Sequence, residues 1–434
     1  MEMNIRKNVL SSVAAFVTNI VLVFFSYRLV VLGGGLEALG LWSTLMAWVY
    51  VIRLGDVGMA NAAIRYVARC DSRLEALRIR RYVDTGILLN GALFFCLSLL
   101  GYLAFSCKMS HILPDNIAAQ VQAKELLPIL FAGFFLSNLS GLILGALRGI
   151  HKGYMAAWLT IAGTIAQLVI VVLLVPRVGL AGLAWGQLGQ HGLILIVGWA
   201  VFQIALQRDS GWAGSWLPTE ISGHALREMF AFSVKAQIAN LTNGLFEPLS
   251  KIMIGRFAGL EVLGLYEMAY KMVTLSRNAI VSGVQATIPA VTRLMETDKT
   301  AARVLYEQSL RTVMRSGAIV LIGVVLGSPI VSWLWLGAVD KDFLIFVALM
   351  ALGFLVNTSG APAYTLGMAS GRMSGNILSG LLSLGLLLIL GILSRITEIA
   401  SFMVLATAIA TAFGGVFIRL RNELLLREKI ETKY

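Results

Sequence analysis

Six lysine and arginine side chains lie inside stretches of this chain that are otherwise apolar enough to cross a lipid bilayer. A cation near the bilayer centre costs roughly 2.5 to 3.5 kcal/mol on insertion scales, so it is retained where it faces a watery cavity, a partner or an anion. Few carboxylates accompany these cations. We interpret them as the lining of a path for a negatively charged passenger. They are Arg28, Arg53, Lys235, Lys251, Lys271 and Arg277.

Polar residues recur at helical spacing in the apolar stretch 229–255 and fall on one face of a helix, which predicts a stripe facing a lumen. Pro248 interrupts this stretch and removes a backbone hydrogen bond, which predicts a hinge or a bent gate. The alternative is an ordinary proline kink in which Glu247 and Lys251 pair at i,i+4. The stripe comprises Gln237, Asn240, Asn243, Glu247 and Lys251.

Arg277 is the cation that most needs a partner from outside its own helix. Glu267 and Lys271 are four residues apart, whereas Arg277 is displaced around the helix and has no acidic residue at i±3 or i±4. Arg53 has Asp56 three residues later, so a closed structural pair is the alternative there. We expect Arg277 to contact the passenger directly.

The remaining cations and acids have a structural and a functional interpretation each. Arg28 and Lys235 lie near span ends, where a long cationic side chain can snorkel to the interface instead of lining a cavity. Asp56, Glu247 and Glu267 are candidates for carrying a coupling proton or sodium ion, because acids near buried cations change protonation as access alternates.

The elements that position these residues are membrane-spanning helices. The 434 residues are 58% hydrophobic and 13% charged, with a mean hydropathy of +0.82, and apolar runs long enough to cross a ~30 Å hydrocarbon core recur throughout. The sequence predicts an all-α polytopic membrane protein with twelve transmembrane helices. The predicted spans are 9–32, 39–64, 83–106, 125–147, 155–176, 180–206, 229–255, 262–289, 312–337, 343–368, 374–394 and 397–418.

The distribution of cations predicts the orientation of the chain, because short cytoplasmic loops collect Lys and Arg. With this span assignment, 23 of the 35 Lys and Arg residues fall on one side of the membrane and six on the other. Both termini are therefore predicted to be cytoplasmic. The net charge of +12 is a topology signal and does not indicate a nucleic-acid partner.

An internal repeat divides the chain into two halves. Residues 35–41 (GLEALGL) recur as 259–265 (GLEVLGL), and the same offset of 224 aligns Arg53 with Arg277 and Thr18-Asn19 with Thr242-Asn243. An even number of spans per unit makes the repeats parallel, with the passenger site expected in a central cavity between two six-helix bundles. We expect Asn19 to line this cavity with Asn240 and Asn243. The predicted domains are an N-terminal lobe (1–207), a cytoplasmic linker (208–225), a C-terminal lobe (226–418) and a basic cytoplasmic tail (419–434).

Several classes of protein are disfavoured. The sequence has no phosphate-binding loop of the GxxxxGK[ST] type, and its four histidines and three cysteines form no metal-ligand spacing and no disulfide framework. Short outward loops leave no room for a periplasmic catalytic domain. We therefore predict no enzyme activity, no cofactor and no metal.

Residues 33–69 (GGGLEALGLWSTLMAWVYVIRLGDVGMANAAIRYVAR) and 255–271 (GRFAGLEVLGLYEMAYK) resemble polysaccharide flippases of the MOP (MATE-like) superfamily, most closely O-antigen (Wzx-type) flippases. The resemblance implies transfer of undecaprenyl-diphosphate-linked oligosaccharide to the periplasmic leaflet of a bacterial inner membrane by alternating access, with H⁺ or Na⁺ as a coupling ion and other glycan-assembly membrane proteins as partners. It also implies that a cationic cavity offsets the charge of the diphosphate. The residues assigned to it are Arg28, Arg53, Lys251, Lys271 and Arg277.

Two alternatives stay open. One is a small-molecule or ion antiporter of the MATE or major-facilitator type, although a cation exporter should have a lumen richer in acids than in bases. The other is a membrane glycosyltransferase or polymerase, which the short outward loops disfavour.

Overall fold

A computed structural model describes residues 2–53, 55, 59–71, 74–113, 116–211, 214–230, 244–285, 287–397 and 400–426. Within these residues the secondary structure is helical, without strands, and nine helices are long and apolar enough to cross a membrane. The predicted all-α polytopic fold is thereby confirmed, and the protein is a multi-pass membrane protein. The chain separates into two compact units, of which unit 1 comprises 1–38 and 45–238 and unit 2 comprises 39–44 and 239–434.

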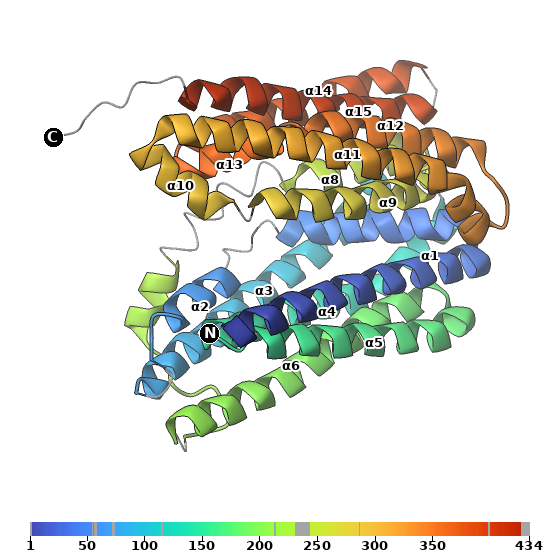
Figure 1. The fold of residues 1–434 in the computed structure, drawn as a ribbon. Helices are drawn as coiled ribbons and strands as arrows, with labels where there is room; N and C mark the ends of the chain where they lie inside the picture. Colours follow the sequence, from blue (N-terminus) through green and yellow to red (C-terminus); the bar gives the residue numbers. More distant parts are fainter. Residues whose placement is uncertain are drawn as a thin grey trace. The chain divides into compact units, whose positions relative to one another are not determined.

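The helices of unit 1 follow the first six predicted spans, with α4, α5 and α6 packed together (Figure 1). The element α1 contains two helices, which correspond to spans one and two and meet at a kink at Gly35. The φ of +72° and ψ of −174° at Gly35 are not helical, and glycine adopts a positive φ without steric cost, so the chain turns there between the two helices. The elements are α1 (Glu2–Arg53), α2 (Met59–Val67), α3 (Ala76–Ile112), α4 (Ile117–Gly149), α5 (Gly153–Val178) and α6 (Leu180–Ser210).

Unit 2 follows the later spans, and α12, α14 and α15 run side by side in it. Pro248 lies in the first turn of α8, where a missing N–H breaks no intrahelical bond, and the chain makes a turn at Leu245 just before α8. The elements are α8 (Phe246–Phe257), α9 (Leu260–Gln285), α10 (Ile288–Thr297), α11 (Lys299–Leu336), α12 (Lys341–Thr358), α13 (Ala361–Ala369), α14 (Ser374–Thr397), α15 (Ala400–Glu423) and the 3₁₀ turn η1 (Leu424–Leu426).

The segment 214–230 packs on α3 of unit 1 through a buried ion pair. Arg80, whose side chain is fully buried, donates from Nη2 to Asp84 Oδ2 at 2.9 Å and to the carbonyl oxygen of Leu217 at 2.9 Å. The Asp84 carboxylate accepts in turn from the backbone N–H of Glu220 at 3.0 Å. Because this pair satisfies backbone groups of a loop that would otherwise be buried without partners, it fixes the segment to α3.

Unit 2 lacks this ion pair at the corresponding positions. The residues 224 positions after Arg80 and Asp84 are Val304 and Gln308, and both are exposed. The pair is therefore a feature of the segment that follows α6, and the repeat itself does not require it.

Candidate functional site

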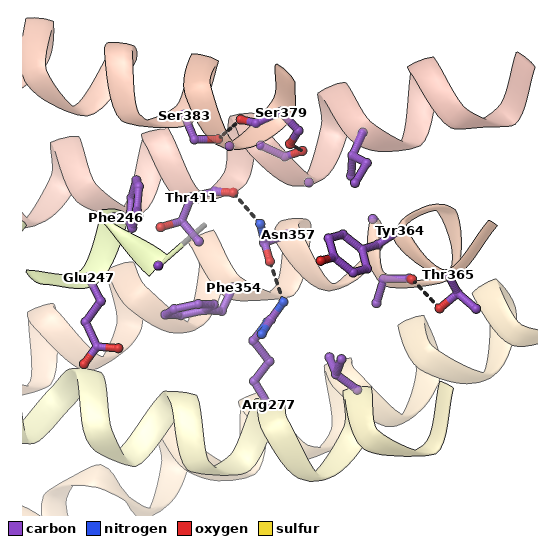
Figure 2. A pocket seen from close by; sticks show the side chains of 18 of the residues that line it. Phe246, Glu247, Arg277, Phe354, Asn357, Tyr364, Thr365, Ser379, Ser383 and Thr411 are labelled. Atoms are coloured by element: carbon purple, nitrogen blue, oxygen red, sulfur yellow. Dashed lines mark hydrogen bonds between the residues drawn. The ribbon is translucent and has the colours of Figure 1, made fainter. Parts of the chain in front are cut away.

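Unit 2 contains a cavity of about 410 Å³ that is lined from α8, α9, α12, α13, α14 and α15. Arg277 reaches it from α9 and Glu247 from α8, so one cation and one carboxylate face the same space (Figure 2). Hydroxyl and amide side chains and aromatic rings complete the wall. The polar lining includes Glu247, Arg277, Asn357, Thr365, Ser383 and Thr411.

Arg277 is held in place by the amide of Asn357. Nη2 of Arg277 donates to Oδ1 of Asn357 at 2.7 Å, and Nδ2 of Asn357 donates to the carbonyl oxygen of Thr411 at 2.8 Å. The amide orientation follows from these partners, because only its NH₂ group can donate to a carbonyl. The guanidinium also lies over the ring of Phe354, 5.5 Å from its centroid, and its buried Nε has no hydrogen-bond partner among the described residues. One edge of the guanidinium is thus fixed, and the half-buried side chain lines the cavity.

A close contact between α12 and α15 places Asn357 within reach of Thr411. A Cβ atom on Gly415 would overlap the backbone of Asn357, and one on Gly353 would lie 2.7 Å from the carbonyl oxygen of Ala408. Small residues therefore let the two helices touch, which brings the amide of Asn357 to a carbonyl of α15.

Lys251 lies in a closed ion cluster. Its Nζ is 2.6 Å from Glu247 Oε1 and 2.8 Å from Glu267 Oε2, and its side chain is 4% exposed. Ser43 Oγ donates to Glu267 Oε2 at 2.7 Å, and the ring of Tyr270 lies 5.2 Å from Nζ. The i,i+4 pair of Glu247 and Lys251 that we considered as an alternative is present. Glu267 takes Lys251 as a partner from another helix, although its spacing on α9 suggested Lys271.

Unit 1 has its own cavity, of about 280 Å³, lined from α1, α4, α5 and α6. Arg53 is exposed and lines it from the end of α1, and no carboxylate occurs among the lining residues that the structure describes. Ser140 Oγ and His191 Nδ1 share a hydrogen bond of 3.3 Å, and Gln190 Nε2 donates to Thr164 Oγ1 at 3.2 Å. Apolar surface makes up most of the wall of this cavity, and its one formal charge among the described residues is positive.

The two cavities occupy equivalent places in the repeat. Eleven of the sixteen residues that line the unit 1 cavity have a residue 224 positions later that lines the unit 2 cavity. A chance similarity between 35–41 and 259–265 would not place lining residues of several helices at the same offset. The duplication therefore extends to the cavities. The equivalent pairs include Arg53 with Arg277, Gly133 with Asn357, Ser140 with Tyr364, Gln187 with Thr411, Gln190 with Gly414 and His191 with Gly415.

The other residues predicted for the site lie elsewhere or outside the described residues. Asn19 is exposed on α1, whereas Arg28 on α1 and Lys271 on α9 are half-buried, and none of the three lines either cavity. The other predicted positions lie outside the residues that the structure describes. These positions are Asp56, Lys235, Gln237, Asn240 and Asn243.

Sequence reasoning missed Asn357 and the lining residues of α6 and α15. Asn357 is a single amide in an apolar span, and nothing local marks it as a partner of a residue 80 positions earlier. The available signal was the repeat offset, because extending it beyond Arg53 and Arg277 pairs Gln187 with Thr411 and Gln190 with Gly414.

A family model described as "Polysaccharide biosynthesis protein" matches residues 5–295, which is more than half of the chain. The chain belongs to this family. The match confirms the predicted resemblance to a polysaccharide biosynthesis family. A curated member of similar sequence is "Probable flippase AglR" of Haloferax volcanii, 26% identical over 269 residues that cover 61% of this chain and 50% of that protein. The match thus spans about half the length of this curated relative.

Two solved transporter structures have a similar fold. An inward-facing multidrug resistance MATE family transporter of the MOP superfamily has a TM-score of 0.77 at 14% identity, covering 93% of this chain and 94% of its own. The lipid II flippase MurJ in an inward closed conformation has a TM-score of 0.71 at 14% identity, covering 96% and 92%. At this identity the likeness establishes the fold alone.

Proposed function

We infer that this protein translocates an undecaprenyl-diphosphate-linked oligosaccharide, such as an O-antigen repeat unit, from the cytoplasmic to the periplasmic leaflet of a bacterial inner membrane. The observation that carries this proposal is the pair of equivalent arginines, Arg53 and Arg277, each lining the cavity of its own unit. An anionic head group must cross a region of low dielectric, where fixed cations replace the water that it loses. The name of the Haloferax relative, a probable flippase, supports the same class of activity.

We assign the diphosphate and the coupling ion to fewer lysines and acids than the sequence suggested. Lys251 has both neighbouring carboxylates as partners, so we assign the diphosphate to Arg53 and Arg277 and a structural role to Lys251. Glu247 is about one-third exposed and faces the unit 2 cavity, which makes it the preferred candidate for coupling to H⁺ or Na⁺, ahead of Glu267 and Asp56.

The experiment is complementation of a bacterial strain that lacks its own glycan flippase, with lipid-linked oligosaccharide accumulation as the readout. We expect the native chain to relieve accumulation and Arg53→Ala and Arg277→Ala to fail at normal protein levels. Arg303→Ala is the matched control, because Arg303 is an exposed cation paired with Glu307 on α11. Full activity of Arg277→Ala would refute the proposal that the charge of Arg277 offsets the charge of the passenger.

The orientation proposed for this activity has a separate test. With both termini cytoplasmic, reporter fusions after Gly35 and Asp340 should be active as periplasmic reporters, and fusions after Arg73 and Glu296 as cytoplasmic ones. The opposite pattern would reverse the proposed direction of access.

An antiporter for cationic drugs is the second candidate, because the fold is shared with a multidrug transporter. Such a protein needs a cavity with net negative charge. Arg53 faces a unit 1 cavity whose described lining has no acid, and Arg277 balances Glu247 in unit 2, so the charges favour an anionic passenger.

A further inference from the structure

The unit 2 cavity offers hydrogen-bond acceptors over most of its polar wall. The hydroxyls of Thr365, Ser383 and Thr411 each donate to the carbonyl oxygen four residues earlier in their own helix, at 3.1, 2.8 and 2.8 Å. Each hydroxyl proton is therefore engaged, and the oxygen atom remains as an acceptor. The carboxylate of Glu247 adds further acceptor atoms.

Arg277 is the one cation among the described lining residues, and the side chains of Tyr270, Tyr364 and Gln285 can also donate. The NH₂ group of Asn357 already donates to the carbonyl oxygen of Thr411. A phosphate presents only acceptors at neutral pH, so away from Arg277 it would meet hydroxyl oxygens and a carboxylate that also accept. The wall suits a ligand with several O–H groups, which donate to the wall and accept from the guanidinium.

The shape and the apolar part of the lining favour a single ring. The cavity of about 410 Å³ lies in the lower part of the range of roughly 300 to 1,000 Å³ that small-molecule pockets occupy. The rings of Phe246, Tyr270, Phe354 and Tyr364 line it, and Figure 2 shows Phe354 and Tyr364 on either side of Asn357. Flat aromatic surfaces can pack against the C–H faces of a sugar ring while the hydroxyl wall meets its edges.

The equivalent cavity in unit 1 differs from the unit 2 cavity in its volume and in its lining residues. Its volume of about 280 Å³ falls below the usual range for ligand pockets. Gln190 and His191 stand where unit 2 has Gly414 and Gly415, and no carboxylate occurs among the described lining residues. Unit 1 therefore offers a small, positively charged pocket around Arg53, whereas unit 2 offers a larger one with balanced charge.

We propose that the unit 2 cavity is a subsite for one glycosyl residue of the passenger, with Arg277 donating to the oxygen atoms of that residue and the hydroxyl wall accepting from its O–H groups. This inference rests on the proposed function, because the glycosyl residue belongs to the lipid-linked oligosaccharide that the protein is proposed to translocate.

The test compares two classes of lipid on the purified full chain in detergent. One probe is undecaprenyl diphosphate without sugar, and the others are the same lipid with one hexose or one N-acetylhexosamine residue. We expect the native chain to bind at least one glycosylated lipid more tightly than the bare one. Thr411→Val and Ser383→Ala should each weaken binding of the preferred glycosylated lipid by roughly fivefold, the effect of one lost hydrogen bond. Binding of the bare lipid should be unchanged.

Thr407→Val is the matched control for Thr411→Val. Thr407 lies one turn earlier on α15, is buried and makes the same kind of hydrogen bond to its own helix, at 2.9 Å, but does not line the cavity. Equal affinity of the native chain for bare and glycosylated lipids would overturn the subsite, as would variants that weaken both classes equally. Binding of neither class would instead refute the proposed function and the subsite with it.

Discussion

Replacing Lys251 by methionine separates a structural cation from one that binds the passenger. Nζ of Lys251 lies 2.6 and 2.8 Å from two carboxylates, and each contact is worth about 6 kcal/mol of gross Coulomb energy at an effective dielectric constant of 20. Desolvation of the three groups cancels most of this attraction, but removal of the cation leaves the carboxylates without compensation. The expected loss of stability is about 3 to 5 kcal/mol, as measured when one partner of a buried ion pair is removed.

The two carboxylates should contribute unequally to that loss. Glu267 has a side chain only 6% exposed, whereas the Glu247 side chain is 37% exposed and keeps part of its hydration. Glu267→Gln added to Lys251→Met removes the more deeply buried charge, and the amide oxygen can still accept from Ser43. We therefore expect the double variant to regain more than half of the lost stability.

The stability of both variants is measured in detergent by unfolding with heat or denaturant. Transport is measured in parallel by complementation. Lys271→Met is the matched control, because Lys271 is a half-buried cation on α9 that takes no part in the ion pairs of Lys251. The structural assignment is wrong if Lys251→Met unfolds like the native chain but transports nothing, since the lysine would then act on the passenger.

Three further predictions concern the positions around the cavities and the segment after α6. Asn357→Leu removes the acceptor of Arg277 Nη2 and the additional hydrogen bond to the Thr411 carbonyl, and it should cost roughly 2 to 4 kcal/mol for one charged and one neutral hydrogen bond; unchanged stability in the detergent assay would contradict this. Arg80→Met should release the segment 214–230 from α3. Proteolysis within that segment should then be faster, while the rate of transport stays at the native value. Gly133→Asn places an amide beside Arg53 as in unit 2, and a Cβ there meets only a backbone atom at 3.8 Å; bare undecaprenyl diphosphate should then bind severalfold more weakly than in Gly133→Ala.

The sequence was sufficient for the helices and the repeat because both depend on local patterns. Apolar runs of spanning length predict helices regardless of their partners, and the recurrence of 35–41 at 259–265 aligned Arg53 with Arg277 before any contact was known. The separation of spans one and two was also predictable, because the glycines at 33–35 indicate a break and the backbone leaves the helical conformation at Gly35.

Partners across helices could not be predicted, because they depend on which helix faces touch. The four-residue spacing of Glu267 and Lys271 suggested a local pair, whereas α8 brings Lys251 to Glu267. The hydrogen bond from Asn357 to the Thr411 carbonyl requires the contact between α12 and α15 that Gly415 permits. Spacing along one helix is therefore a weak guide to ion pairs where a neighbouring helix supplies a buried partner.

Duplication gave each unit the same backbone positions, and the side chains at those positions decide what each cavity can hold. The arginine is kept in both units, but its neighbour is Asn357 in one and Gly133 in the other. An arginine held by an amide has a fixed edge and a defined direction for its remaining donors, which favours selection among ring substituents. An exposed arginine with no amide at that position can follow a charged group as it moves, so the two arginines are suited to different kinds of ligand group.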